Sequence, residues 1–459
     1  MSLVNETKCV FSTLPGNLNN KIICYQAIIL LNKFTGGHLF MRHFLIISFI
    51  FSIATACSNS SARKTAGQKP ALQTGIWRAV LQSPGGELPF GLDIAKKTDS
   101  TYTVHVMNGQ EKLALDEAIV QGDSLRIPME LFESEIVAKL NDSTLTGRFT
   151  RYSPTGNVYM NFSAQHGLTY RFTDAKATPA TDLSGKWAVT FQSEGDSYPA
   201  VGVFEQKGND LTGTFLTTTG DYRYLAGTVQ QDSMYLSCFD GTHVYLFKAK
   251  VGNKANALIG GFWSSMAGYE TWTANRDSTA ALPDANSLTY LKKGYDKLAF
   301  TFPNVEDEKP ISLDDNRYKG KVVVVQLMGS WCPNCMDETK FLAPWYQKNK
   351  DRGVEVVALA YERHPEFSVS APKLLKMKDR FDVDYEVLLA GVNDKKAATQ
   401  TLPMIDKILA FPSTIYIDKK GKVRRIHTGF SGPGTGKYYE EFVEEFNLFI
   451  DKLLTEEAM

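Results

Sequence analysis

The fold of this chain is decided by one stretch, Val322-Val323-Val324-Val325-Gln326-Leu327-Met328-Gly329-Ser330-Trp331-Cys332-Pro333-Asn334-Cys335-Met336-Asp337-Glu338. Its run of β-branched residues predicts a strand buried on both faces, and helix-forming residues continue after the second cysteine through Tyr346. Cys332 and Cys335 therefore stand where a strand passes into a helix N-terminus. The unpaired N–H groups and positive dipole end of a helix favour a thiolate, which predicts a lowered pKa for Cys332. Because one helical turn separates the pair, we expect Cys332 to attack a disulfide and Cys335 to resolve the mixed disulfide.

Alternating strand and helix patterns follow this dithiol. In order, they are a strand over 353–360, a helix over 371–380, a strand over 385–389, a helix over 395–409, a strand over 411–418 and an amphipathic closing helix as far as Leu453. This alternation predicts an α/β domain over 300–459. The preceding segment, 276–299, is rich in Ala, Ser, Asp and Pro and is the best candidate for a linker, within which Leu288–Leu298 is expected to form a short helix.

The strand–Trp-Cys-Xaa-Xaa-Cys–helix pattern and the order of these elements resemble the thioredoxin fold, and more closely its TlpA/ResA-like extracytoplasmic branch, over about residues 300–455. The resemblance implies a thiol–disulfide oxidoreductase. It also implies that Pro412 is cis and faces the dithiol, although a trans proline opening an edge strand is the alternative. Trp331, Pro333 and Phe411 would bind the substrate together with Pro412, and Pro333 suits a first helical position.

The resemblance also assigns a role to Glu338, which lies three residues after Cys335. In this family a glutamate at that spacing lies beneath the active site and exchanges a proton with the buried cysteine, for which a raised pKa is suitable. The alternative is a solvated helix glutamate, as Asp337 is expected to be a solvated aspartate. Two residues depart from the thioredoxin pattern: Gln326 replaces a buried aspartate, and Phe411 replaces a threonine or valine. The direction of electron flow is therefore not readable from the sequence.

Zinc binding is the competing interpretation of a Cys-Xaa-Xaa-Cys pair. It needs two further ligands, whereas the chain has no second cysteine pair, and His364 and His427 belong to unrelated elements. We therefore expect no metal and no other bound cofactor. Cys238 lies in a strand pattern without a nearby partner and is expected to be an inert, half-buried thiol.

The middle of the chain contains two related β units, over 75–175 and 183–275. Three motifs recur in the same order about 110 residues apart. The matches are Gly75-Ile76-Trp77 with Gly185-Lys186-Trp187, Val120-Gln121-Gly122-Asp123-Ser124 with Val229-Gln230-Gln231-Asp232-Ser233, and Leu145-Thr146-Gly147-Arg148-Phe149 with Leu258-Ile259-Gly260-Gly261-Phe262. The fold class predicted is thus two related all-β barrels or sandwiches followed by a thioredoxin-like domain. Trp77, Trp187, Phe149 and Phe262 are expected in the cores, with contact to a ligand as the alternative.

The segment over 41–57 has the pattern of a targeting signal. Met41-Arg42-His43, the apolar run over 44–53 and Ala54-Thr55-Ala56-Cys57 resemble a signal peptide that ends in a bacterial lipobox. We expect a signal peptide over 41–56, lipidation of Cys57, and a polar tether over 57–74, with an ordinary signal peptide as the alternative. Residues 1–40 do not fit this scheme and are interpreted as a gene-model extension, or else as part of a longer leader.

Composition restricts the partners. The chain has 50 basic and 50 acidic side chains, and this balance argues against nucleic acid. The sequence predicts a lipid-anchored thiol–disulfide oxidoreductase on the periplasmic side of a Gram-negative type envelope, which reduces protein disulfides and receives electrons from an upstream membrane thiol carrier. The alternatives are a thiol peroxidase and an envelope lipoprotein that binds a ligand or partner through its β region.

Overall fold

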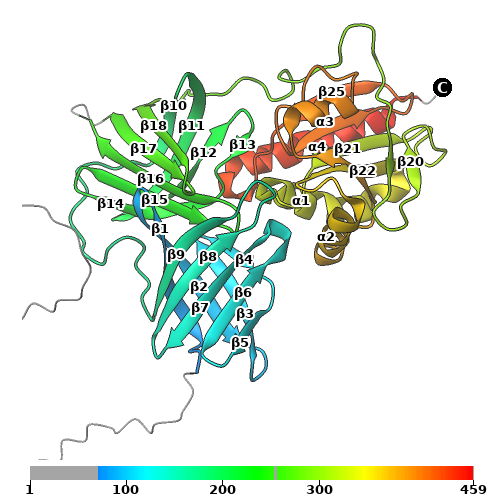
Figure 1. Ribbon diagram of the computed structural model, residues 1–459. Coiled ribbons are helices and arrows are strands. Elements are labelled where there is room, and N and C mark those ends of the chain that lie inside the picture. The colour runs from blue at the N-terminus through cyan, green and yellow to red at the C-terminus, as the bar shows by residue number, and fades with distance from the viewer. Residues whose placement is uncertain (1–70, 253–255, 458–459) are drawn as a thin grey trace, which may run out of the picture. The chain divides into compact units, whose positions relative to one another are not determined.

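The computed structural model of the chain describes residues 71–252 and 256–457, which form two β-barrels and an α/β domain (Figure 1). Four expectations fall outside these ranges: the gene-model extension, the signal peptide, lipidation at Cys57 and most of the tether. Within the described ranges, no helix combines the length and hydrophobicity that crossing a membrane requires.

The first barrel is a closed antiparallel sheet of eight strands with one short additional strand. The order β2-β1-β9-β8-β7-β6-β5-β3 is closed by pairing between β2 and β3, and β4 extends β3 as a hairpin. Its elements are β1 (Gly75–Ser83), β2 (Gly86–Lys96), β3 (Thr101–Asn108), β4 (Glu111–Ala114), β5 (Ala118–Gln121), β6 (Ser124–Met129), the 3₁₀ turn η1 (Glu130–Phe132), β7 (Ser134–Asn141), β8 (Thr144–Arg151) and β9 (Val158–His166).

The second barrel repeats this topology strand for strand. Its order is β11-β10-β18-β17-β16-β15-β14-β12, closed by pairing between β11 and β12, with β13 extending β12. Its elements are β10 (Gly185–Ser193), β11 (Asp196–Lys207), β12 (Asp210–Thr217), β13 (Gly220–Asp221), β14 (Leu225–Gln230), β15 (Ser233–Phe239), β16 (Val244–Val251), β17 (Ala257–Ser264) and β18 (Gly268–Arg276). The predicted duplication is confirmed. Of the two expected architectures, barrel and sandwich, both units form barrels, because the sheet of each is closed.

The repeated motifs mark equivalent positions in the two barrels. The four aromatic side chains expected in the cores are all buried: Trp77, Trp187, Phe149 and Phe262. Each tryptophan lies near the start of its barrel, where its indole N–H donates to the backbone carbonyl four residues earlier, at 3.1 Å in the first barrel and 3.0 Å in the second. Because the buried indole has its one polar atom satisfied, it fills the end of the barrel without an unpaired donor.

The C-terminal domain is built on a five-stranded sheet in the order β23-β22-β21-β24-β25. The pairs β21–β22 and β22–β23 are parallel, and β24 and β25 are antiparallel to their neighbours. All seven residues of β21 are buried, as its unbroken apolar run predicts. The elements are β19 (Thr301–Pro303), β20 (Pro310–Ser312), β21 (Val322–Met328), α1 (Pro333–Asn349), η2 (Lys350–Arg352), β22 (Val354–Glu362), α2 (Phe367–Phe381), β23 (Glu386–Val392), α3 (Lys395–Thr401), β24 (Ser413–Ile417), β25 (Val423–Thr428), η3 (Pro433–Thr435) and α4 (Lys437–Thr455).

Three local expectations were wrong. Leu288–Leu298 forms no helix; the segment is irregular, makes one bridge from Leu291 to Ile405, and turns at Gly294 with a φ of +96°. The helix beginning at Lys395 ends at Thr401 instead of continuing to residue 409, because a proline at 403 cannot extend it. Cys238 is completely buried in the second barrel, not half-buried, and this burial raises the pKa of its thiol well above the usual value.

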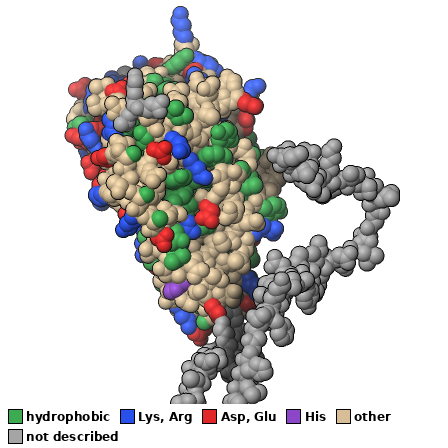
Figure 2. All heavy atoms as spheres, turned by 90° about the vertical axis from the view of Figure 1, so that its left-hand side faces the viewer, with side chains coloured by type: hydrophobic (Ala, Val, Ile, Leu, Met, Phe, Trp, Pro, Cys, Tyr) green, Lys and Arg blue, Asp and Glu red, His purple; other side chains and the backbone are tan. Residues whose placement is uncertain are grey.

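On the face turned to the viewer in Figure 2, basic and acidic side chains are interspersed, with hydrophobic side chains scattered between them. This distribution agrees with the balanced composition: neither sign of charge gathers into one broad patch on that face.

Candidate active site

The dithiol is held by the start of α1. Cys332 is the N-cap residue, and its Sγ accepts a hydrogen bond from the backbone N–H of Cys335 at 3.2 Å. Pro333 occupies the first helical position, where its missing N–H removes no hydrogen bond. Both thiols are free in the structure. The expected strand-to-helix arrangement is therefore present, with Cys332 at the helix tip and Cys335 inside the first turn.

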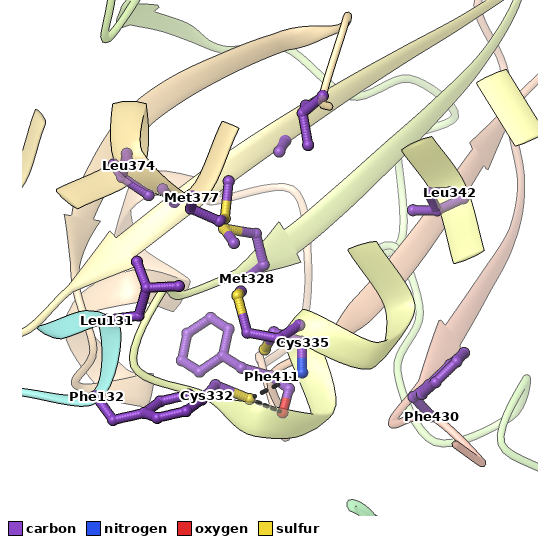
Figure 3. Packing of buried hydrophobic residues seen from close by; sticks show 14 of the residues in the cluster. Leu131, Phe132, Met328, Cys332, Cys335, Leu342, Leu374, Met377, Phe411 and Phe430 are labelled. Atoms are coloured by element: carbon purple, nitrogen blue, oxygen red, sulfur yellow. Dashed lines mark hydrogen bonds between the residues drawn. The ribbon is translucent and has the colours of Figure 1, made fainter. Parts of the chain in front are cut away.

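The loop before β24 faces Cys332. The Phe411–Pro412 peptide bond is cis, as the sequence predicted, and the carbonyl oxygen of Phe411 lies 3.5 Å from Cys332 Sγ (Figure 3). The ring of Phe411 meets that of Trp331 edge to face with centroids 6.1 Å apart, and the indole N–H of Trp331 donates to Tyr361 O at 2.8 Å. The four residues predicted to bind substrate thus lie in segments that adjoin the dithiol.

Glu338 lies beneath the dithiol and is buried. Its carboxylate accepts hydrogen bonds from Thr414 Oγ1 at 2.6 Å and from Gln326 Nε2 at 2.8 Å. Burial raises the pKa of Glu338 to about 7, against the opposing effect of these two donors. Burial also raises the pKa of Cys335 well above its usual value, and Cys332 and the Glu338 charge contribute in the same direction. The structure therefore places a carboxyl that titrates near neutral pH within electrostatic range of a thiol that holds its proton tightly.

A second buried glutamate, which the sequence analysis did not identify, fixes the loop before the dithiol. Glu362 ends β22 and accepts hydrogen bonds from the backbone N–H of Ser330 at 2.7 Å and from its hydroxyl at 2.8 Å. Burial raises the pKa of Glu362. An acidic residue at the carboxyl end of a buried strand was the available signal, since that sheet edge carries the active-site loops.

The expectation that Asp337 is solvated was wrong. Asp337 is 6% exposed and forms an ion pair with Arg223, which comes from the second barrel. The guanidinium of Arg223 also donates to Pro333 O at 3.2 Å and pairs with Glu111 of the first barrel and with Asp240. The second barrel therefore contacts the first turn of the active-site helix through Arg223, and the first barrel is joined to the same cluster through Glu111.

Cys332 is only 6% exposed, and it opens onto a cavity of about 500 Å³ that is also lined by Trp331, Pro333 and Phe411. Among the described residues, no group of three or more His, Cys, Asp or Glu side chains is arranged to hold a metal ion. The site contains two thiols, a buried carboxyl and a cavity in front of the outer sulfur.

Comparison with known proteins agrees with this geometry. Residues 284–441 match the Redoxin family model. The thiol-disulfide oxidoreductase ResA of Halalkalibacterium halodurans is 28% identical over 143 residues, covering 30% of this chain and 70% of the relative. The ResA of Geobacillus kaustophilus is 30% identical over 114 residues, covering 24% of this chain and 57% of the relative.

A solved structure of a thiol:disulfide interchange protein from Chlorobium tepidum is 19% identical, with a TM-score of 0.27, and covers 38% of this chain and 99% of its own. All these matches cover a minority of this chain, and that of the Geobacillus relative spans little more than half its length. The C-terminal third of the chain therefore has the thioredoxin fold, matches the Redoxin family model and is similar to the ResA thiol–disulfide oxidoreductases.

Proposed function

We propose that this protein is a lipid-anchored reductase of protein disulfides in the cell envelope. The observation that carries the proposal is the free dithiol at the N-terminus of α1, with a buried carboxyl that titrates near neutral pH beneath it. The names of the ResA relatives support the reaction type. Anchoring rests on the lipobox-like segment that ends at Cys57.

The proposed reaction is a two-electron exchange. The thiolate of Cys332 attacks one sulfur of the substrate disulfide, so that a mixed disulfide forms and the other substrate sulfur leaves as a thiolate, which takes up a proton from solvent. Cys335 then gives its proton to Glu338 and attacks Cys332 Sγ. The second substrate thiolate leaves and is protonated, and the products are a substrate dithiol and a Cys332–Cys335 disulfide.

Glu338 is the base for the second step. A thiol whose pKa lies well above the usual value is a poor nucleophile near neutral pH unless a neighbouring group takes its proton. The Glu338 carboxyl, with a pKa of about 7, is matched to that task, because it is partly ionised at the pH of the reaction.

A reductase must be returned to its dithiol form. No bound cofactor is invoked for this step, and we propose that an upstream membrane thiol carrier delivers the two electrons by a further exchange at Cys332. Trp331, Pro333, Phe411 and Pro412 would hold the substrate or the carrier in front of this sulfur.

The reduction potential of the pair tests the direction of electron flow. The chain from Ala62 onward, which keeps every described residue, is equilibrated with thiol–disulfide buffers, and its free thiols are then trapped. A potential near that of thioredoxin, about −270 mV, supports a reductase, whereas a value near that of the oxidant DsbA, about −120 mV, reverses the direction. A Cys335→Ser variant should accumulate a mixed disulfide on Cys332, and a Cys332→Ser variant should not. Failure of both cysteines to exchange at all contradicts the proposal.

A further inference from the structure

The cavity in front of Cys332 has walls from two different parts of the chain. One wall belongs to the thioredoxin-fold domain and includes Trp331, Phe411 and Lys395. The other belongs to the second barrel. Its side chains are Tyr198, Tyr222, His243 and Tyr245, together with the connection over 217–221. The outer sulfur of the dithiol is thus reached through a space that the barrel encloses on one side.

The barrel wall is an ordered aromatic surface. The hydroxyls of Tyr198 and Tyr222 lie 2.8 Å apart, and Tyr198 donates to Glu270 at 2.6 Å. The rings of Tyr222 and Tyr245 meet edge to face at 5.2 Å, and His243 stacks on Tyr245 with centroids 4.6 Å apart. These contacts fix the rings in place, so the surface is formed before any substrate arrives.

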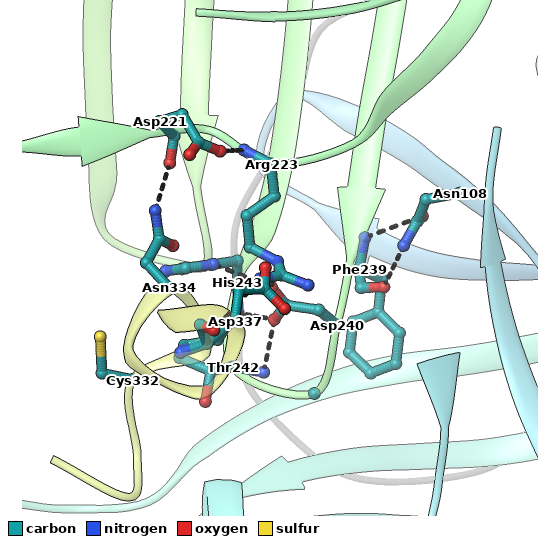
Figure 4. Close-up of polar contacts among 12 residues, drawn as sticks. Asn108, Asp221, Arg223, Phe239, Asp240, Thr242, His243, Cys332, Asn334 and Asp337 are labelled. Atoms are coloured by element: carbon teal, nitrogen blue, oxygen red, sulfur yellow. Dashed lines mark hydrogen bonds and ion pairs between the residues drawn. The ribbon is translucent and has the colours of Figure 1, made fainter. Parts of the chain in front are cut away.

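The wall is also fastened to the active-site helix. Asn334 Nδ2 donates to the carbonyl of Asp221 at 3.0 Å, and Thr242 Oγ1 donates to the carbonyl of Trp331 at 3.4 Å. Figure 4 shows Arg223 reaching from the same barrel toward Asp337. Because polar contacts at several points join the barrel to the residues around Cys332, the width of the cavity is set by the structure.

We propose that the second barrel is the other half of the substrate site, and that it restricts the substrate to a flexible, extended polypeptide segment carrying a disulfide-bonded cysteine. This inference rests on the proposed disulfide reductase activity and names its substrate class. A cavity of about 500 Å³ has room for a ligand or a few residues of chain. A cysteine on the surface of a folded domain, by contrast, would have to approach Cys332, a residue that is 6% exposed and lies behind the barrel wall of the cavity.

The lining also indicates which residues would flank that cysteine. Aromatic faces on both walls favour apolar and aromatic neighbours, which stack against them. Lys395 places a cation on the wall, whereas the Asp221 carboxylate is occupied by the backbone N–H groups of Gly432 and Arg223, at 2.8 and 2.6 Å. A segment with apolar or acidic residues beside the cysteine fits this surface better than a basic one.

Three substrates with the same leaving group test the inference in the chain from Ala62 onward. They are Ellman's reagent, a linear peptide whose single cysteine is joined to thionitrobenzoate, and a stably folded domain with the same mixed disulfide on a surface cysteine. In each case the enzyme dithiol becomes a disulfide, and the coloured thionitrobenzoate and the substrate thiol are released. The wild-type protein should reduce the peptide at least about tenfold faster than the folded domain.

Single substitutions locate the effect on the wall. Tyr245→Ala and Tyr198→Ala should each raise KM for the peptide about fivefold, since one aromatic contact corresponds to about a factor of 2 to 10. Both should lose more rate with the peptide than with Ellman's reagent, because the longer substrate uses more of the wall, and circular dichroism should show that both variants remain folded. Tyr245→Phe keeps the ring and should retain most of the affinity. Tyr269→Ala removes a tyrosine that is 54% exposed on the same barrel and does not line the cavity, and it serves as the matched control.

The outcomes separate the inference from the function on which it rests. If wild-type protein reduces the peptide and the folded domain equally fast, or if both alanine variants keep the wild-type KM, the inference is wrong. The inference is also wrong if both alanine variants lose the same factor in reduction rate with the peptide and with Ellman's reagent. The rings would then support the dithiol without selecting the substrate. If the wild-type protein reacts with none of the three disulfides, the proposed function itself fails.

Discussion

Replacing Glu338 by glutamine removes the one buried group whose pKa the structure places at about 7 beneath the dithiol. An unfolded glutamate titrates near 4.5, so between these two pH values the folded chain keeps a proton that the unfolded chain has released. The free energy of unfolding consequently falls by about 1.4 kcal/mol per pH unit, or about 3 kcal/mol in total. This contribution is fully present below about pH 4.5 and is lost as the pH rises through about 7.

Urea unfolding at about pH 5 and about pH 8 measures this loss. Glu362 and Asp221 also have raised pKa values and add to the wild-type slope, so the informative quantity is the difference between the wild-type protein and Glu338→Gln. Between the two pH values, the free energy of unfolding should fall by up to about 3 kcal/mol less in the variant than in the wild-type protein. Glu444→Gln, on the exposed side of α4, is the control and should keep the wild-type slope.

The same variant should slow the second step of the reaction. Without a proton acceptor, Cys335 should resolve the mixed disulfide about 10²-fold or more slowly near neutral pH, and most of the deficit should disappear at a pH high enough to ionise the thiol directly. An unchanged slope in the unfolding experiment together with an unchanged resolving rate would refute the assignment of both the burial effect and the proton transfer.

Two further predictions concern parts of the chain outside the dithiol. Arg223→Met should destabilise the protein by about 3–5 kcal/mol in urea unfolding, because it leaves the carboxylates of Glu111, Asp240 and Asp337 buried without their shared cation; a variant as stable as the wild type would show that these charges are not held as described. Cys57→Ser in the full-length chain should move the protein from the membrane fraction to the soluble fraction of cells, and continued sedimentation with membranes would contradict lipid anchoring at that position.

The parts of the fold that the sequence predicted are those that local pattern determines. The run over 322–328 and the two cysteines specify a strand, a turn and a helix N-terminus within a few residues, and the structure has all three. The barrels were predictable as a pair because the duplication repeats the same motifs in the same order. The failed helix over Leu288–Leu298 illustrates the limit: helix-forming residues are present, but the segment instead lies against residues more than a hundred positions away.

The contacts between the barrels and the residues around the dithiol could not be predicted from local sequence pattern. Lys340, three positions after Asp337, would suit a solvated helix aspartate as well as a buried one. The buried partner, Arg223, is 114 positions away in the second barrel. The partners of Glu133, which directly follows η1, are equally remote: Arg363, Lys373 and His364 all belong to the C-terminal domain. Pairs of this kind are set by how the domains pack, and a single sequence carries no periodic signal for them.

The charges that join the barrels to the active-site helix have a consequence for function. A buried cation shared by several carboxylates adds little net stability, because each charge loses its hydration, yet any arrangement that separates the partners is strongly penalised. Arg223 is 2% exposed and contacts both barrels and α1. It therefore favours one arrangement of the two barrels and the C-terminal domain over all others. The space in front of Cys332 is bounded by those same bodies. The ion cluster and the cavity in front of Cys332 are therefore two results of one packing arrangement. If the cavity binds substrate as we propose, a substitution that loosens the cluster should widen the range of disulfides that reach the dithiol.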